Sequence, residues 1–250
     1  MRKQTELLGS RTSVEARYAL LPLEGVPLSR LPEWPGAEVQ VLAAPALGAQ
    51  FAEYRITMPP DTEGKHAGDG EIEHFLFILE GTVDVSIGPG GHRLSTGGYA
   101  LIPPSTDYTV RSSEGATLLL LRKRYERLSA GTEFEPVVGA EQEVGGRIYM
   151  GDEGALLQTL IPDDLSYDLA VNIFTFESGH SLPVTETHVM EHGLYVLGGK
   201  GLYYLGDTWM EVAESDFIWM GPFCPQSYYA TGPEPTRYIY YKNVNREIPL

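Results

Sequence analysis

The sequence predicts an all-β protein made of two tandem units, and three observations support this prediction. Glycine and proline make up 28 and 18 of the 250 residues, well above their usual share of about 12 %. Short apolar runs rich in Val, Ile, Tyr, Phe and Leu recur between these turn residues about every 8–12 positions, and no long window has the helical period of 3.6. Finally, part of the sequence is repeated at a constant separation, which predicts two related halves.

The repeat defines the domain organisation. Residues 74–81 resemble residues 192–199, which lie 118 positions later, and the same separation relates residues 98–104 to residues 216–222. Chance similarity between apolar runs rarely keeps one register over two separate segments. Upstream, residues 51–58 and 169–176 also look like corresponding strands. We therefore expect homologous halves over residues 40–125 and 147–250, each a sandwich or a barrel of short strands.

The remaining segments are predicted to be an arm and a connector. Residues 1–39 contain four prolines and are expected to pack on the two halves or on a neighbouring subunit. Residues 126–146 contain five Glu, four Gly and one Pro without sustained periodicity, which is typical of a connector.

Composition excludes several classes of function. The chain has 18 Lys and Arg against 34 Asp and Glu, a net charge of −16, which argues against binding to nucleic acid or to an anionic membrane surface. The N-terminus lacks the apolar run of a signal peptide, and no stretch is apolar enough to span a bilayer. The single cysteine, Cys224, cannot form an internal disulfide. We expect a soluble cytoplasmic protein.

The second half carries a candidate metal site. Glu186 and His188 are two positions apart and would project from the same face of a strand, and His192 follows four residues later. A carboxylate with two imidazoles suits a divalent ion of the Mn, Fe, Co, Ni or Zn group. The alternative is that these are solvated residues in a loop near the end of a strand.

Together with Gln226, this motif resembles the two-part metal motif of the cupin superfamily, whose members are jelly-roll β-barrels. Glu186 stands in the first histidine position of that motif, His192 in the carboxylate position and Gln226 in the last histidine position. The chain as a whole resembles the bicupin (S)-ureidoglycine aminohydrolases of purine (allantoin) catabolism. The resemblance covers the arm, both halves and the end at residues 238–246, and its matches include residues 70–73, 99–104, 186–189 and 191–193.

The resemblance implies two tandem jelly-roll barrels with an N-terminal arm, and a set of site residues. It places Mn²⁺ in the C-terminal barrel, bound by residues matching Glu186, His188, His192 and Gln226. It implies that Tyr238, Lys242 and Tyr203 help to bind the substrate together with Glu186 and Gln226, and that Glu186, Lys242 and Tyr238 take part in catalysis.

The first half is predicted to lack a metal. A constant offset of 118 aligns the four ligand positions with Gly68, Gly70, His74 and Tyr108, so three of the four ligands are missing. His74 is expected to be buried or to contact a ligand residue without itself binding a metal. His66 is expected to be exposed to solvent. The basic run at residues 122–124 is expected at a solvated strand end or a salt-bridged interface, not in a substrate site.

The resulting functional prediction is hydrolysis of (S)-ureidoglycine to (S)-ureidoglycolate and ammonia by a Mn²⁺-dependent enzyme. The alternatives are an Fe-dependent cupin dioxygenase acting on a small organic acid, and a non-catalytic bicupin that binds a small ligand. The expected partners are a small-molecule substrate and further copies of the chain in a homo-oligomer, because exposed strand edges favour assembly. No nucleic-acid or membrane partner is expected.

Overall fold

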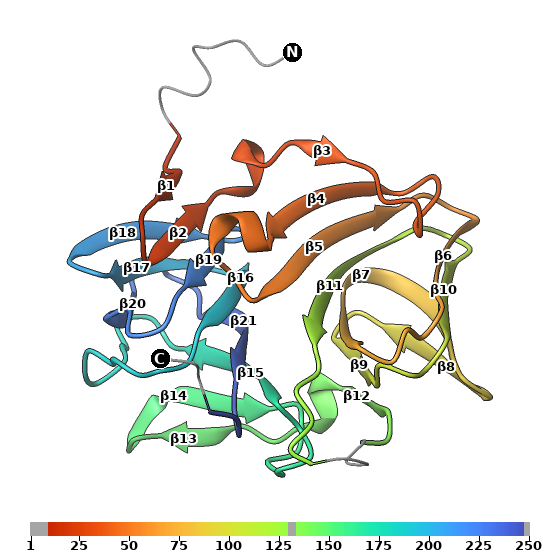
Figure 1. Cartoon of the computed structure of the whole chain (residues 1–250). Helices are drawn as coiled ribbons and strands as arrows, with labels where there is room; N and C mark the ends of the chain where they lie inside the picture. The colour runs from red at the N-terminus through yellow and green to blue at the C-terminus, as the bar shows by residue number, and fades with distance from the viewer. Residues whose placement is uncertain (1–9, 130–133, 248–250) are drawn as a thin grey trace. The chain divides into compact units, whose positions relative to one another are not determined.

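The structure is a computed structural model that describes residues 10–129 and 134–247 (Figure 1). It consists almost entirely of strands, and its helical elements are three single turns: η1 (Leu23–Gly25), η2 (Pro45–Leu47) and η3 (Glu141–Glu143). The all-β prediction is therefore confirmed. Within the described ranges, no helix is long and apolar enough to cross a membrane.

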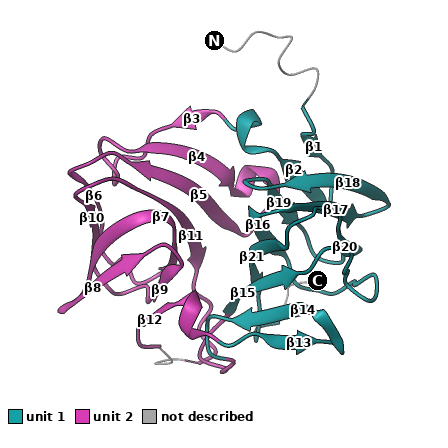
Figure 2. Ribbon diagram, turned by 180° about the vertical axis from the view of Figure 1, so that it is seen from behind, with its two compact units in different colours: residues 1–26, 145–162, 169–250 teal, residues 27–144, 163–168 magenta. Residues whose placement is uncertain are grey.

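The chain divides into two compact units (Figure 2). Unit 1 contains the described residues 10–26, 145–162 and 169–247, and unit 2 contains residues 27–144 and 163–168 apart from the undescribed residues 130–133.

Unit 2 is formed around one long, bent strand, β7. The sheet runs in the order β12-β9-β7-β11-β5-β4-β3, and β10 and β8 also pair with β7 while β6 pairs with β10. Gly81, with φ +84°, allows β7 to bend, because a side chain there would meet the backbone of Gly115. The strands are β3 (Leu28–Ser29), β4 (Glu38–Ala43), β5 (Phe51–Met58), β6 (Thr62–His66), β7 (Ile72–Ile87), β8 (Gly90–Ser95), β9 (Gly98–Ile102), β10 (Tyr108–Ser112), β11 (Ala116–Arg124) and β12 (Val137–Ala140).

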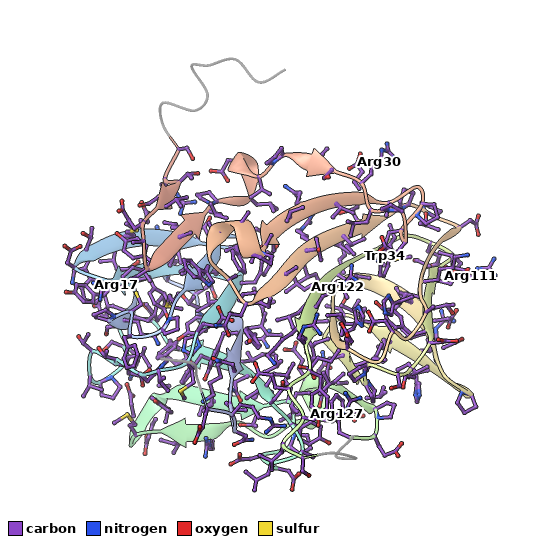
Figure 3. The ribbon with its side chains drawn as sticks, viewed as in Figure 1. Arg17, Arg30, Trp34, Arg111, Arg122 and Arg127 are labelled. Atoms are coloured by element: carbon purple, nitrogen blue, oxygen red, sulfur yellow. The ribbon has the colours of Figure 1, made fainter. Side chains whose placement is uncertain are left out.

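The core of unit 2 is formed by alternate residues of these strands. Ile56, Leu76, Val110 and Leu118 are almost completely buried in one cluster, as expected when every second side chain faces inward. Trp34, labelled in Figure 3, closes this core by packing its ring against Gly64, where a Cβ atom would lie only 2.2 Å from Trp34 Cε3.

Unit 1 contains an eight-stranded sheet and a three-stranded sheet. The larger sheet has the order β1-β2-β19-β16-β21-β15-β14-β13, and the smaller has the order β18-β17-β20. Its apolar core contains residues of both sheets. The strands are β1 (Ser13–Val14), β2 (Tyr18–Leu21), β13 (Arg147–Tyr149), β14 (Asp152–Thr159), β15 (Leu169–Phe176), β16 (His192–Gly198), β17 (Lys200–Leu205), β18 (Thr208–Ala213), β19 (Phe217–Met220), β20 (Gln226–Ala230) and β21 (Thr236–Asn243).

The boundaries of the units differ from those expected from the repeat. The described part of the expected arm, residues 1–39, is divided: β2 extends the sheet of unit 1 beside β19, whereas residues 27–39 belong to unit 2. The expected connector, residues 126–146, contains β12, which pairs with β9. Residues 163–168, which fall inside the expected second half, belong to unit 2, where Asp168 binds the buried Lys123.

Candidate metal and substrate site

A cavity of about 170 Å³ lies at one end of the core of unit 1. All seven site residues predicted from the sequence line it: Glu186, His188, His192, Tyr203, Gln226, Tyr238 and Lys242. They come from three strands of the two sheets, from the start of β20 and from the loop before β16. The structure therefore brings together side chains that lie up to 56 positions apart in the sequence (186 to 242).

The strands direct these side chains inward. His192 begins β16 and shares its face with the core residues Leu194 and Val196. On β21, Tyr238 and Lys242 share one face, and the backbone of Lys242 pairs with that of His192. An antiparallel bridge between the backbones of Glu186 and Gln226, with N to O distances of 2.8 and 2.9 Å, holds the ligand loop against β20.

Three polar groups meet at the centre of the site. Nε2 of His188 lies 3.2 Å from Nε2 of His192 and 2.9 Å from the side-chain amide nitrogen of Gln226. Nδ1 of His192 lies 2.7 Å from the carbonyl oxygen of Glu191, which can only accept, so Nδ1 carries the proton and Nε2 carries a lone pair. The Gln226 amide donates to His188, so Nε2 of His188 also carries a lone pair.

This arrangement fits a cation. Two imidazole lone pairs 3.2 Å apart repel each other, and an ion bound to both nitrogens removes that repulsion. Burial lowers the pKa of His192 to about 3 and, with a smaller effect of the Lys242 charge, also lowers the pKa of His188. Both side chains are therefore neutral near pH 7, the form in which imidazole binds metals.

The fourth predicted ligand, Glu186, lies on the same cavity but has another partner. Its Oε1 accepts a hydrogen bond of 2.6 Å from the hydroxyl of Tyr149. In the described parts of the chain, no group of three or more His, Cys, Asp and Glu side chains is close enough to hold a metal. Two imidazoles and one amide thus form the centre, and the carboxylate is held at the wall by Tyr149.

The rest of the cavity is lined by tyrosines that keep their protons. Burial raises the pKa of Tyr203 and Tyr238 well above the usual value, and the Glu186 charge adds to the effect. Burial likewise raises the pKa of Tyr149 and Tyr240. These hydroxyls are therefore hydrogen-bond donors at neutral pH, as the 3.0 Å bond from Tyr203 to Oε1 of Gln226 shows.

Three polar lining residues are absent from the sequence prediction, Arg147, Tyr149 and Tyr240. Arg147 and Tyr149 lie on β13 and share one face of that strand, being two positions apart. Arg147 and Tyr149 precede the repeated segments of the second half and match no motif. The only signal in the sequence is that an arginine and a tyrosine are two positions apart.

The structure corrects two expectations for the first half. His66, not Gly68, is the counterpart of Glu186, because the backbones of His66 and Tyr108 pair as those of Glu186 and Gln226 do. The segment from His66 to His74 in unit 2 spans eight positions and the segment from Glu186 to His192 in unit 1 spans six, so a constant offset misplaces the counterpart of Glu186. His66 is half-buried instead of fully solvated: its Nε2 is buried, and its ring lies 4.2 Å from the buried ring of His74.

Comparison with known proteins supports the predicted family. The chain is 35 % identical over 249 residues to the probable (S)-ureidoglycine aminohydrolase of Oryza sativa subsp. japonica, covering 97 % of this chain and 78 % of that protein. It is 31 % identical to the (S)-ureidoglycine aminohydrolase of Escherichia coli K12, covering 98 % of this chain and 95 % of the relative. No family model matches.

Solved structures support the fold. The putative glyoxylate-induced protein of Pseudomonas aeruginosa is 35 % identical, with a TM-score of 0.89 over 98 % of this chain and 94 % of that chain. The bicupin oxalate decarboxylase of Bacillus subtilis is 14 % identical, with a TM-score of 0.71 over 94 % of this chain and 79 % of its own, which shows a shared fold. The bicupin prediction is thereby confirmed, and the identity to the curated relatives over nearly the full chain shows that this protein belongs to the (S)-ureidoglycine aminohydrolase family.

Proposed function

We propose that the protein hydrolyses (S)-ureidoglycine to (S)-ureidoglycolate and ammonia with the help of a divalent ion, Mn²⁺, in unit 1. The observation that carries the proposal is the cavity of about 170 Å³, which is lined by all seven predicted site residues in a chain whose relatives bear the name of this activity. The cavity is small and has charged and polar side chains in its wall, which suits a substrate with a carboxylate, an amine and a ureido group on one carbon.

We assign the metal to Glu186, His188, His192 and Gln226. The facing lone pairs of the two imidazoles support a cation between them, and the Glu186 carboxylate, while its Oε1 stays hydrogen-bonded to Tyr149, would supply its other oxygen as a ligand. The Gln226 side chain now directs its amide nitrogen at His188, and a turn of the amide would direct Oε1 there instead. The resulting two nitrogen and two oxygen ligands suit Mn²⁺ better than they suit thiolate-preferring ions. One solved structure with this fold is described as having Mn(II) centres, that of the Bacillus subtilis oxalate decarboxylase. When bound, the ion acts as a Lewis acid that holds and polarises the substrate.

The substrate's own chemistry defines what the side chains must do. The bond between the central carbon and the amine breaks with help from the ureido nitrogen lone pair, and the amine takes up a proton and leaves as ammonia. Water then adds to the same carbon and gives up a proton, so that a C–O bond replaces the C–N bond. The enzyme must therefore fix one enantiomer, assist the amine and admit water to one face.

Lys242 and the tyrosines supply these interactions. The Lys242 ammonium group lies on the cavity wall and would pair with the substrate carboxylate, which also lessens repulsion between that carboxylate and Glu186. The hydroxyls of Tyr203 and Tyr238 keep their protons near pH 7 and can donate hydrogen bonds to the substrate, Tyr238 to the departing amine. Holding the groups in this orientation before reaction lowers the barrier by up to about 7–11 kcal/mol in ideal cases.

The test is ammonia release from freshly generated ureidoglycine, measured together with bound metal. We expect His188→Ala to lose bound Mn²⁺ and at least about a hundredfold of activity, because it removes a central metal ligand. His92→Ala, which alters an exposed histidine of β8 in unit 2, is the matched control and should behave as the wild type. Wild-type ammonia release by His188→Ala would refute the assignment of the site.

Two further expectations from the sequence stay predictions. Location in the cytoplasm and assembly into a homo-oligomer are tested by neither the fold nor the site. Light scattering of the purified chain measures the second directly.

A further inference from the structure

A second polar cluster lies at the end of the core of unit 2. Its members are His66 on β6, His74 on β7, Tyr108 on β10 and Arg122 on β11, and Arg122 is labelled in Figure 3. Each of the last three is two positions from a core residue of the same strand and therefore shares its inward face: Leu76, Val110 and Leu120. We call these four side chains the unit 2 polar cluster.

Strand pairing makes this cluster the counterpart of the cavity residues of unit 1. Tyr108 pairs with His66 as Gln226 pairs with Glu186. Arg122 pairs with His74 as Lys242 pairs with His192. The correspondence rests on pairing within each unit and holds for four positions at once.

Compared with the cavity residues of unit 1, the unit 2 polar cluster has lost the negative charge and kept the positive charge. The position of Glu186 holds an imidazole in unit 2, while the cation at the position of Lys242 is kept as an arginine. The position of His188 falls on Gly68, where a Cβ atom would lie 2.5 Å from the backbone of Ser105, so no third imidazole fits. The cluster therefore loses the carboxylate and one imidazole that a cation needs, and keeps a guanidinium that repels a cation.

One ring nitrogen of each histidine in the cluster has no hydrogen-bond partner. The Nε2 atoms of His66 and His74 are both buried without a hydrogen-bond partner, and His74 as a whole is only 1 % exposed. Their rings lie 4.2 Å apart, and each contacts the ring of Tyr108, at 5.6 and 5.2 Å. Burial lowers the pKa of His74 to about 2, and burial and the Arg122 charge lower that of His66, so both rings are neutral and can donate one N–H each.

The guanidinium has a carboxylate neighbour that does not hydrogen-bond to it. Oε1 of Glu33 lies 3.8 Å from Nη1 of Arg122, which is beyond hydrogen-bond distance. The Arg122 side chain is 26 % exposed, so solutes can reach it. Two further carboxylates, Asp69 and Asp107, lie near His66. Asp69 accepts a hydrogen bond from the backbone amide of Glu71, and Asp107 accepts one from that of Gly68.

We propose that the unit 2 polar cluster binds the carboxylate of a small organic acid. The Arg122 guanidinium group would donate hydrogen bonds to both oxygens of the ligand carboxylate and displace Glu33. The imidazole N–H groups and the Tyr108 hydroxyl would donate the remaining hydrogen bonds. A guanidinium presents parallel N–H groups that match a carboxylate, and buried donors without a partner favour a ligand rich in acceptors. Unit 2 would then be an anion-binding module, distinct in its chemistry from the metal-binding unit 1.

The probe is glycolate, added to the full chain labelled with ¹⁵N in its six histidines. We expect the imidazole signals of His66 and His74 to shift in a saturable way, with chloride at equal ionic strength as the blank. The signals are assigned with single histidine substitutions. Unmoved His66 and His74 signals at saturating glycolate would overturn the proposal.

Four variants at three charged residues sharpen the test. Arg122→Gln should weaken glycolate binding at least about tenfold, because it removes a charge-assisted pair of hydrogen bonds. The glycolate affinity of Arg122→Lys should lie between those of the wild type and Arg122→Gln. Glu33→Gln should tighten binding, because it removes the competing carboxylate. Lys242→Gln should leave the shifts of His66 and His74 unchanged.

Unchanged glycolate affinity in Arg122→Gln, with its wild-type melting temperature, would also refute the proposal. Ammonia release by Arg122→Gln reports separately on unit 1, so failure of this inference and failure of the proposed function are distinguishable.

Discussion

The hydroxyl of Tyr149 fixes one oxygen of the Glu186 carboxylate and leaves the other available to the cavity. The hydrogen bond is 2.6 Å long, and it joins the edge strand β13 to the loop that carries His188. Burial and this hydrogen bond raise the pKa of Tyr149, so its hydroxyl stays a donor at neutral pH. We therefore infer that Tyr149 is a positioning residue, which would act on the substrate through Glu186.

Removal of this hydroxyl tests its role. We expect Tyr149→Phe to lower kcat by about tenfold or more, because a hydrogen bond to a charged group contributes about 1.5–3 kcal/mol. The phenyl ring keeps its edge contact with Phe174, at 4.8 Å between centroids, so the melting temperature should change little.

Tyr204→Phe is the matched control for Tyr149→Phe. Tyr204 lies on β17 and contacts Trp209, outside the cavity lining. Equal kcat values for Tyr149→Phe and the wild type would show that Glu186 is held in place without the tyrosine.

At this scale the sequence predicted the site residues that belong to a motif, and missed those that belong only to the fold. Glu186, His188 and His192 are close in sequence, and Gln226 follows from the resemblance to a known family. Tyr149 reaches the cavity because β13 pairs with β14, a contact that leaves no mark in the local sequence. A motif predicts residues by their type and spacing. A residue such as Tyr149, which approaches the motif residues only through strand pairing, has no such signal.

Strands β7 and β11 of unit 2 carry a buried charge cluster. Nζ of Lys123 lies 2.5 Å from Oδ2 of Asp168 and 3.7 Å from Oε1 of Glu73, and all three side chains are at most 4 % exposed. The Lys123 ammonium group is thus the shared cationic neighbour of the Glu73 and Asp168 carboxyl groups. Burial and the neighbouring Asp168 raise the pKa of Glu73 well above its usual value, so in the folded state Glu73 keeps its proton to a higher pH than in the unfolded state.

This difference predicts a pH dependence of stability. An acid whose pKa is raised by folding stabilises the fold fully below its unfolded pKa of 4.5, and this contribution is lost as pH rises towards the folded value. The free energy of unfolding should therefore fall with pH above that point, by up to about 1.4 kcal/mol per pH unit. Glu73→Gln should flatten this decline, measured by urea unfolding over a series of pH values.

Glu63→Gln is the control for the pH experiment, since Glu63 is an exposed residue of β6 in the same unit. It should leave the slope as in the wild type. An unchanged slope in Glu73→Gln would show that other groups cause the pH dependence.

The elements also show where prediction from the sequence fails. The short-strand pattern and the repeat predicted the strands of both halves. The assignment of β2 to the sheet of unit 1 could not be predicted, because it depends on pairing with β19 some 200 positions away, assisted by a paired contact of Arg11 with Asp216. His66 was misplaced for a related reason, since loop length and strand register are not visible in a constant repeat offset.

The whole chain combines two units of similar topology with different chemistry. Unit 1 has two imidazoles, an amide and a carboxylate on its cavity, and unit 2 has an arginine, two imidazoles and a phenol at the matching positions. Each unit has its own apolar core. The two units thus share an architecture and differ in a few polar side chains at the ends of their strands, which underlies the different ligands proposed for them.

This separation of roles predicts that Mn²⁺ stabilises unit 1 more than unit 2. A ligand that binds only the folded state stabilises it by about 2.7 kcal/mol at a free concentration one hundred times Kd. Hydrogen exchange followed by mass spectrometry resolves peptides of each unit, and we expect Mn²⁺ to slow exchange in β16, β20 and β21 while β7 and β11 change less. Glycolate should have the reverse pattern, slowing exchange in β7 and β11. His188→Ala should abolish the effect of Mn²⁺ and keep that of glycolate, because the two ligands occupy different units. Equal slowing of both units by Mn²⁺ would mean that the chain responds as one cooperative body, and the division of labour between the units would then be wrong.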